Sequence, residues 1–360
     1  MKTYKVSFLE TFRSEDILRE RRVSPVPEFL SNSDDEFQMN NRFDYFIVDP
    51  EDEYSGEGKV KSFIFLFHGL NERSWDKYNS WAEELAKRTG RGVVMFPLAF
   101  HMNRSPVEWS NVRLMSSFIG RLAGKKRARK ENLTFANYAL SSRIKSDPYR
   151  FYISGKQTIF NVCQLIDQIH RGEHPVIDKG AKFDIFAYSI GGLLSQVLLQ
   201  SDPMGRFSNC RLFMFCAGSV FRKMDGNSRL IMDRESYYIL KRYYSSRFIK
   251  LFKKREQLDS IDKAFISHIG TRALRRERLR FYMENYQRVK VVSLKQDRVI
   301  PTKGIKRALG SVWPKCLEEL DFTYKYSHEM PFPVNIPEKD SKEYWFKEVF
   351  RRAADFLSKQ

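Results

Sequence analysis

The sequence predicts an α/β protein whose central sheet is mostly parallel and carries helices on both faces. Short apolar runs alternate with amphipathic segments along most of the chain, which is the pattern of strands connected by helices. Several of these runs are apolar at almost every position, as expected for strands covered on both faces. A length of 360 residues allows one domain of this class with insertions.

The individual strands and helices can be placed from these runs. Residues 4–12 and 43–49 are expected to form early strands at an antiparallel edge, and KSFIFLF at 61–67 a fully covered strand. Residues 31–41 form the expected exposed loop. The other expected strands are 92–100, 182–188, 210–216, 289–294 and 320–326, and the expected helices are 76–88, 157–170, 191–200 and 341–357.

Two long segments interrupt this alternation. We expect a single domain over residues 1–360, with an insertion at 101–156 and a helical cap or lid at 222–287. Long segments of this kind in a compact α/β domain tend to be lids or binding elements. Between 222 and 290, nineteen Lys and Arg residues face eight Asp and Glu residues, so this part carries over half of the net charge of +19.

The composition bounds the location and the redox chemistry of the protein. No run approaches the roughly 20 apolar residues that cross a bilayer, and the N-terminus lacks the apolar core of a signal peptide, so we expect a cytoplasmic protein. HExxH, Walker A and GxGxxG motifs are absent, so no metal, nucleotide or other cofactor is implied. The cysteines lack CxxC spacing and are expected to be small core residues: Cys163, Cys210, Cys216 and Cys316.

The strongest functional signal is a serine between an apolar strand and an apolar helix. The strand expected at 182–188 leads into the run AYSIG at 187–191, in which Ser189 is the central residue. A sharp strand-to-helix turn of the form G-x-S-x-G exposes a serine nucleophile and needs small residues two positions before and after it. Ala187 stands where glycine is usual, so the motif is imperfect. The other interpretation is a serine that caps a helix.

This segment resembles the nucleophile elbow of the α/β-hydrolase superfamily, and the resemblance covers most of residues 61–358. In that superfamily an acid and then a histidine follow the serine along the chain. The resemblance implies that Asp297, in the run DRVIP, orients the base, with Asp225 as the runner-up. It also implies that His328, after the last expected strand, is the general base. The alternatives are an aspartate that caps a helix and a histidine in a surface loop.

The same resemblance implies two backbone N–H groups that hold an oxyanion. The run HGLN at 68–71 follows an expected strand, so the N–H of Leu70 would face the site while His68 stays structural. The N–H of Ile190, at the start of a helix, would be the second donor. A plain strand-to-helix turn is the other interpretation of 68–71.

Residues 100–106 are expected near the mouth of this site. His101 could line the pocket, and Arg104 could bind a carboxylate of the substrate. Both residue types more often serve to pack a loop.

The basic cap has two interpretations. In the first, it is an amphipathic helical cap with its aromatic face inward and its charged face in solvent. In the second, it recruits an anionic acyl substrate or makes peripheral contact with an anionic surface, together with a basic loop at 125–130. No nucleic-acid-binding module is visible, so no specific nucleic acid is expected.

The predicted function is hydrolysis of a carboxylester, or of a related thioester or amide, in a small-molecule acyl substrate. Ser189 would form an acyl-enzyme, and water activated by His328 would release the acid. The alternatives are an acyltransferase that uses the same three residues and a non-catalytic binding protein built on this fold.

Overall fold

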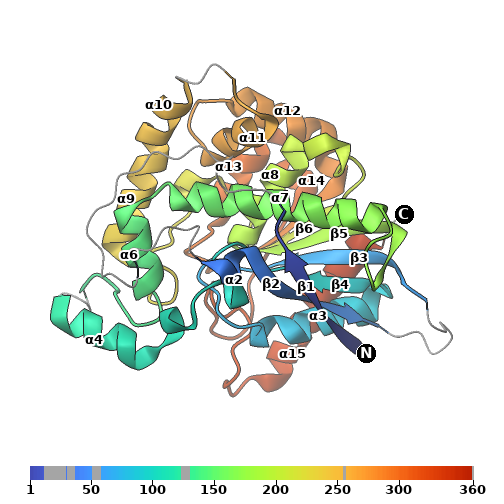
Figure 1. The fold of residues 1–360 in the computed structure, drawn as a ribbon, viewed down its shortest axis with the longest axis horizontal. Helices are drawn as coiled ribbons and strands as arrows, with labels where there is room; N and C mark the ends of the chain where they lie inside the picture. Colours follow the sequence, from blue (N-terminus) through green and yellow to red (C-terminus); the bar gives the residue numbers. More distant parts are fainter. Residues whose placement is uncertain (12–29, 31–36, 51–57, 123–129, 254–256, 359–360) are drawn as a thin grey trace.

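The computed structural model describes residues 1–11, 30, 37–50, 58–122, 130–253 and 257–358. Its centre is one eight-stranded sheet (Figure 1). The strands are β1 (Lys2–Leu9), β2 (Arg42–Asp49), β3 (Val60–Phe67), β4 (Gly92–Met95), β5 (Ile177–Tyr188), β6 (Leu212–Phe215), β7 (Val289–Leu294) and β8 (Leu317–Leu320).

The order of the strands is β1-β2-β4-β3-β5-β6-β7-β8. β2 pairs antiparallel with both β1 and β4, whereas all the other neighbouring strands run parallel. The mostly parallel sheet with an antiparallel edge at its early strands is therefore confirmed. Crossovers between parallel strands bring the carboxyl ends of β3, β5, β6 and β7 to one edge of the sheet.

Helices cover both faces of the sheet, which makes three layers (Figure 1). Two helices cover one face, α3 (Asp76–Thr89) and α15 (Lys339–Leu357), and two cover the other, α7 (Arg150–His170) and α8 (Ile190–Ser201). Other helices outside the insertions, within the described residues, are α2 (Gln38–Asn41), α13 (Thr302–Leu309) and α14 (Trp313–Cys316). Short 3₁₀ turns lie at Pro203–Gly205, Tyr286–Arg288 and Gly310–Val312.

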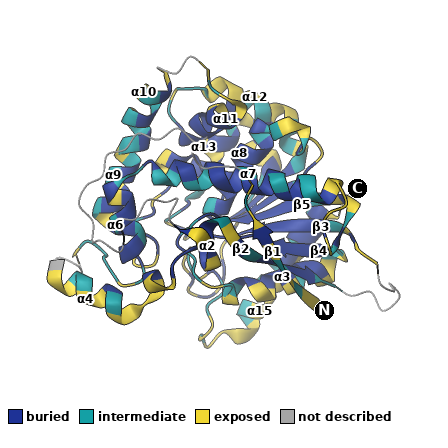
Figure 2. Ribbon diagram, viewed as in Figure 1, coloured by how far each residue is buried: buried dark blue, intermediate teal, exposed yellow. Residues whose placement is uncertain are grey.

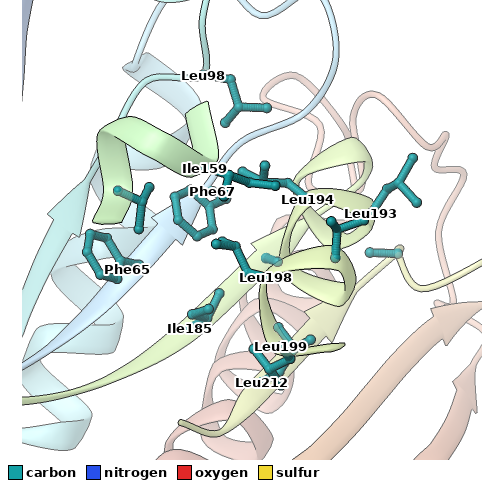
Figure 3. Packing of buried hydrophobic residues seen from close by; sticks show 14 of the residues in the cluster. Phe65, Phe67, Leu98, Ile159, Ile185, Leu193, Leu194, Leu198, Leu199 and Leu212 are labelled. Carbon is teal, nitrogen blue, oxygen red and sulfur yellow. The ribbon is translucent and has the colours of Figure 1, made fainter. Parts of the chain in front are cut away.

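The central strands are buried from both sides, because successive residues along them alternate between two cores (Figure 2). On β3, Phe65 and Phe67 pack against α7 and α8, whereas Ile64 and Leu66 pack against α3 and α15. Figure 3 shows Phe65 and Phe67 among the aliphatic side chains of α7 and α8. This two-sided burial accounts for the unbroken apolar runs of the sequence.

Helices of the two insertions lie outside the sheet, with α4, α6, α9 and α10 along the left of the view and α11 and α12 at its top (Figure 1). The first insertion contains 3₁₀ turns at Met102–Arg104 and Val107–Ser110, followed by α4 (Val112–Leu122) and α6 (Tyr138–Ser146). The second contains a 3₁₀ turn at Phe221–Lys223, a π-helical turn at Tyr243–Arg247, and α9 (Arg234–Arg242), α10 (Phe248–Lys253), α11 (Ser260–Ile269) and α12 (Arg275–Asn285).

Most aromatic residues of the second insertion face inward. Tyr244, Phe248 and Phe252 are buried, whereas Tyr238 is 64% exposed. The basic residues of this insertion are not all exposed to solvent, although the sequence pattern predicts a charged face in solvent. Arg278 is buried and donates hydrogen bonds to the carbonyl oxygens of neighbouring segments, so its charge is not part of the surface.

The expected last strand at 320–326 is wrong. β8 ends at Leu320, where its pairing with β7 ends. The following residues still alternate between buried and exposed, because Phe322, Tyr324 and Tyr326 pack against the core beside α3 and α15. That alternation imitates a strand although the backbone lies outside the sheet.

Other boundaries also differ from the expectation. β4 covers only the first four residues of the expected strand at 92–100, and α7 begins seven residues before the expected helix at 157–170. The prediction of an exposed loop at 31–41 is wrong for residues 37–41. There Phe37 is buried, and α2 follows it. The basic loop at 125–130 lies outside the described residues except for Lys130.

All four cysteines are buried and free, as expected for small core residues. In the described part of the chain, no helix combines the length and the apolar character needed to cross a membrane.

Candidate active site

The turn between β5 and α8 holds Ser189 in a strained backbone conformation. Its φ of 56° and ψ of −122° lie where side chains other than glycine are rarely found. The turn is tight because a Cβ placed on Gly191 would lie 2.6 Å from the carbonyl oxygen of Phe67 in β3. The short side chain of Ala187 is fully buried at the other end of the turn. These contacts explain the requirement for small residues on both sides of the serine.

The structure brings together the serine, histidine and acid that the sequence singles out. Ser189 Oγ lies 2.7 Å from His328 Nε2, and His328 Nδ1 lies 2.7 Å from Asp297 Oδ2. All three residues are at most 5% exposed. Because Asp297 is a carboxylate acceptor, it keeps the proton on Nδ1 and leaves the lone pair of Nε2 facing the hydroxyl. This arrangement can deprotonate the Ser189 hydroxyl.

Backbone N–H groups fix the orientation of the Asp297 carboxylate. Its Oδ1 accepts hydrogen bonds from the N–H groups of Val299 at 2.9 Å and Ile300 at 2.8 Å. Oδ2 is therefore the oxygen directed at His328. Asp225, the runner-up acid, instead accepts a hydrogen bond from the N–H of Asn227.

Tyr188 supports both the ring and the backbone of His328. Its ring stacks on the imidazole of His328, with centroids 5.5 Å apart and planes at 13°, and its hydroxyl donates to the backbone carbonyl of His328. The sequence places Tyr188 in the elbow but gives no sign of its contacts with His328. An aromatic residue before the serine was the only available signal.

His68 supports the loop after β3 rather than acting as a base, as the resemblance implied. Its Nε2 accepts a hydrogen bond from the N–H of Leu98 at 3.0 Å, so Nδ1 donates to the carbonyl of Gly69 at 2.8 Å. Complete burial holds the pKa of His68 well below its usual value. The side chain therefore stays neutral and keeps this loop in place.

A polar network joins this loop to the loop that carries His328. The N–H of Gly69 donates to the hydroxyl of Tyr78, which donates to the carboxylate of Glu72. Lys77 forms an ion pair with Glu72 and donates to the backbone carbonyl of Glu329, next to His328. None of these side chains was predicted, because the network joins segments more than 250 residues apart.

Leu70 and Ile190 lie beside Ser189. Both residues line a small cavity together with Ser189, Phe151 and Val299. Their role as backbone donors to an oxyanion stays a prediction.

The prediction that Arg104 could bind a substrate carboxylate is wrong. Arg104 is fully buried and donates to the carbonyl oxygens of Asn40 and Pro97 and to the side-chain oxygen of Asn161. Its guanidinium also lies 3.9 Å from the centre of the Phe43 ring. The guanidinium therefore joins the loop to the domain and does not face a substrate.

His101, by contrast, lines the cavities next to the site. Its Nδ1 donates to the carbonyl of Ala99 at 2.9 Å. Burial lowers the pKa of His101 to about 4, so the ring is neutral near pH 7.

The two insertions meet above the loop after β3. The hydroxyl of Thr134 in the first donates to the carbonyl of Arg229 in the second at 2.6 Å. The side-chain amide of Asn71 donates to the carbonyl oxygens of both Ala136 and Leu230, each at 2.8 Å. The two insertions therefore contact each other, and both are hydrogen-bonded to the loop after β3.

An apolar cavity lies between α7, α8 and α11. It shares Leu70, Phe151 and Ile190 with the small cavity that Ser189 lines. Most of its wall is aliphatic or aromatic, including Leu98, Ile159, Leu193, Leu194, Val197, Ile261 and Phe265. In the described part of the chain, no group of three His, Cys, Asp or Glu side chains could hold a metal ion.

We expect the Gly191→Ala variant to be less stable than the wild type. The added methyl group would meet the backbone oxygens of Phe67 and His68 at 2.6 and 2.9 Å, and neither can move without disturbing β3. The expected loss is about 1–3 kcal/mol of the free energy of unfolding, as for other overpacked sites. Denaturant unfolding measures it. Gly120→Ala is the control, because nothing lies within 4 Å of a Cβ there. Equal stabilities of the two variants would contradict the prediction.

The strand order, the antiparallel β2 and the strained serine between β5 and α8 define an α/β-hydrolase fold, as the sequence resemblance implied. Within this class, the chain belongs to the family DUF6051, described as a family of unknown function, whose model matches residues 16–358. No curated protein matches the sequence.

Solved structures similar to this chain include two esterases and a lipase. Carboxyl esterase 2 of the mycorrhizal fungus Tuber melanosporum is 11% identical, with 88% of this chain and 82% of that chain covered and a TM-score of 0.42. The monoacylglycerol lipase of Paleococcus ferrophilus is 13% identical, with 99% of each chain covered and a TM-score of 0.41. Esterase LipW of Mycobacterium marinum is 10% identical, with 89% of this chain and 79% of that chain covered and a TM-score of 0.44. The fold assignment rests on the strand order and not on these likenesses.

Proposed function

We propose that this protein is a serine hydrolase that cleaves carboxylic esters through an acyl-enzyme. The observation that carries the proposal is the continuous hydrogen-bonded chain from Ser189 Oγ through the His328 ring to Asp297, with 2.7 Å at each step. A serine that only capped a helix would need neither the strained backbone nor a buried histidine and aspartate aligned behind it.

In the proposed reaction, Ser189 Oγ attacks the ester carbonyl carbon while His328 Nε2 takes the hydroxyl proton. The negative charge that develops on the carbonyl oxygen is held by the N–H groups of Leu70 and Ile190. His328 then gives its proton to the leaving alcohol, and the acyl group stays on Ser189. A water molecule, deprotonated by His328, attacks the acyl carbon and releases the carboxylic acid. Asp297 stays ionised and stabilises the imidazolium throughout.

The experiment combines covalent labelling with an esterase assay. We expect a fluorophosphonate probe to label the wild-type protein at a single residue, which peptide mass spectrometry identifies as Ser189, and we expect hydrolysis of 4-nitrophenyl butyrate. Labelling should decrease when the ester is present in excess, because the probe and the ester react with the same oxygen. A protein that is neither labelled nor active would exclude the proposal and favour a binding function. Labelling with acyl transfer to an alcohol, but no acid released, would favour the acyltransferase.

A further inference from the structure

Gly155 occupies an unusual position for a glycine. It lies inside α7, a helix of 21 residues, and lines the apolar cavity next to the candidate site. A glycine within a helix lowers stability by roughly 0.5–1 kcal/mol relative to alanine, because it loses more backbone entropy on folding. Its presence there therefore calls for a physical reason.

The described residues provide no steric reason. A Cβ on Gly155 would find none of their atoms within 4 Å, whereas a Cβ on Gly191 or Gly192 would lie 2.6 or 2.5 Å from neighbouring atoms. Gly155 is also not among the glycines with a positive φ. The space beside it belongs to the cavity, since Gly155 is one of the residues that line it.

The cavity extends from the neighbourhood of Ser189 along α8. Ile190 lines it at the end next to Ser189, and Leu193, Leu194 and Val197 continue the same wall. The seven residue-to-residue steps of α-helix from Ile190 to Val197 correspond to a rise of about 10 Å. Figure 3 shows Leu194 of α8 beside Ile159 of α7, and both residues line the cavity. A chain that was attached to Ser189 and ran along α8 would contact these side chains.

Lys156, a charged residue that lines this cavity, is already paired. Its Nζ lies 2.6 Å from Asp259 Oδ2 and 2.8 Å from Asp262 Oδ1. The rest of the wall is mostly aliphatic and aromatic, so it would bind an uncharged hydrocarbon chain better than a carboxylate or a phosphate.

We propose that Gly155 is a specificity-determining residue, whose missing side chain leaves room for an extended aliphatic acyl chain bound between α7, α8 and α11. This inference rests on the proposed function and names its substrate class: esters of unbranched fatty acids with at least about eight carbons, a length that matches the wall along α8. A side chain at position 155 would fill the space and shorten the acyl chain that fits, without disturbing the fold.

The test compares Gly155→Ala and Gly155→Leu with the wild type on 4-nitrophenyl acetate, butyrate, octanoate and dodecanoate. For the wild type, we expect kcat/KM to rise from acetate to octanoate. For Gly155→Leu, we expect kcat/KM to fall at least about tenfold with octanoate, as for a lost hydrophobic subsite, and to change less than about threefold with acetate. Gly155→Ala should show the same trend with a smaller effect.

Two control measurements separate an effect on the cavity from a general effect on the protein. Gly120→Ala and Gly120→Leu in α4, where a Cβ also meets nothing within 4 Å, should leave the chain-length profile unchanged. Gly155→Ala should unfold at the same or a higher temperature than the wild type, because it removes the helix glycine without a clash. A profile in Gly155→Leu that follows the wild type, or a Gly155→Ala variant that is clearly destabilised, would overturn the inference.

Failure of the proposed function gives a different result. In that case the wild type would hydrolyse none of the four esters, and the cavity would be tested by calorimetry with decanoate. Binding by the wild type that is lost in Gly155→Leu would still support a chain-binding cavity. Equal binding by both proteins, or binding by neither, would reject it.

Discussion

The Ser189→Ala variant is expected to fold like the wild type and to lose about 10⁶-fold in kcat for ester hydrolysis. The hydroxyl of Ser189 forms the hydrogen bond to His328, so removing it leaves the imidazole with nothing to deprotonate. The free energy of unfolding should fall by at most about 1–3 kcal/mol, because the change removes one hydrogen bond and leaves Nε2 of the buried His328 ring without its partner. The loss of activity would therefore be confined to the chemistry.

The measurement is steady-state hydrolysis of 4-nitrophenyl butyrate, together with fluorophosphonate labelling and thermal unfolding. Ser201→Ala is the matched control, because this serine lies at the end of the same helix, is also buried, and donates to a backbone carbonyl. It should keep its label and at least about half of the wild-type kcat, as expected for a residue outside the site. Residual labelling of Ser189→Ala at the wild-type rate would show that another nucleophile reacts.

The convergence of Ser189, His328 and Asp297 could be predicted from the sequence because chain order and strand ends place these residues. Each lies in a loop that follows an apolar run, and in a parallel sheet such loops meet at one edge. The exact end of the last strand did not matter. His328 reaches the site although β8 ends at Leu320, eight residues earlier, because Tyr188 holds its backbone and Asp297 holds its ring.

Residues that depend on distant partners could not be predicted in this way. Arginine is a residue type that often binds anions, yet Arg104 donates hydrogen bonds to Asn40 and Asn161, each more than 50 residues away. Lys77 and Glu72 show no local pattern at all, and their role follows only from the contact with Glu329. Long-range pairing of polar groups is decided by the packing of the whole domain, which no local periodicity encodes.

The contact between the two insertions could not be predicted for the same reason. Hydrogen bonds that join the two insertions connect residues more than 90 positions apart, and several of them end on backbone carbonyls, which any residue type provides. The sequence could therefore indicate that both insertions exist, but not that they contact each other above Asn71.

The Asp297→Asn variant is expected to lower kcat by about 10⁴-fold while the fold is retained, as for the same change in other triads. The structure explains why an isosteric amide would fail. The N–H groups of Val299 and Ile300 both donate to Oδ1, so the amide oxygen of asparagine would occupy that position. The amide NH₂ would then face His328 Nδ1, which must become an acceptor. The proton would move to Nε2, and the ring could no longer accept the proton of Ser189.

Asp225→Asn provides the matched control, because it makes the same chemical change at the runner-up acid, which contacts the N–H of Asn227 and not the histidine. It should change kcat less than about twofold, as expected for an exposed site. The two variants are compared by kcat over about pH 5 to 9, which spans the ordinary titration range of histidine, and by thermal unfolding. If Asp297→Asn kept activity within about tenfold of the wild type while Asp225→Asn lost it, the acid would have been assigned to the wrong residue. If both were fully active, His328 would need no acidic partner, and the hydrogen-bonded chain from Ser189 to Asp297 would not carry the proposed function.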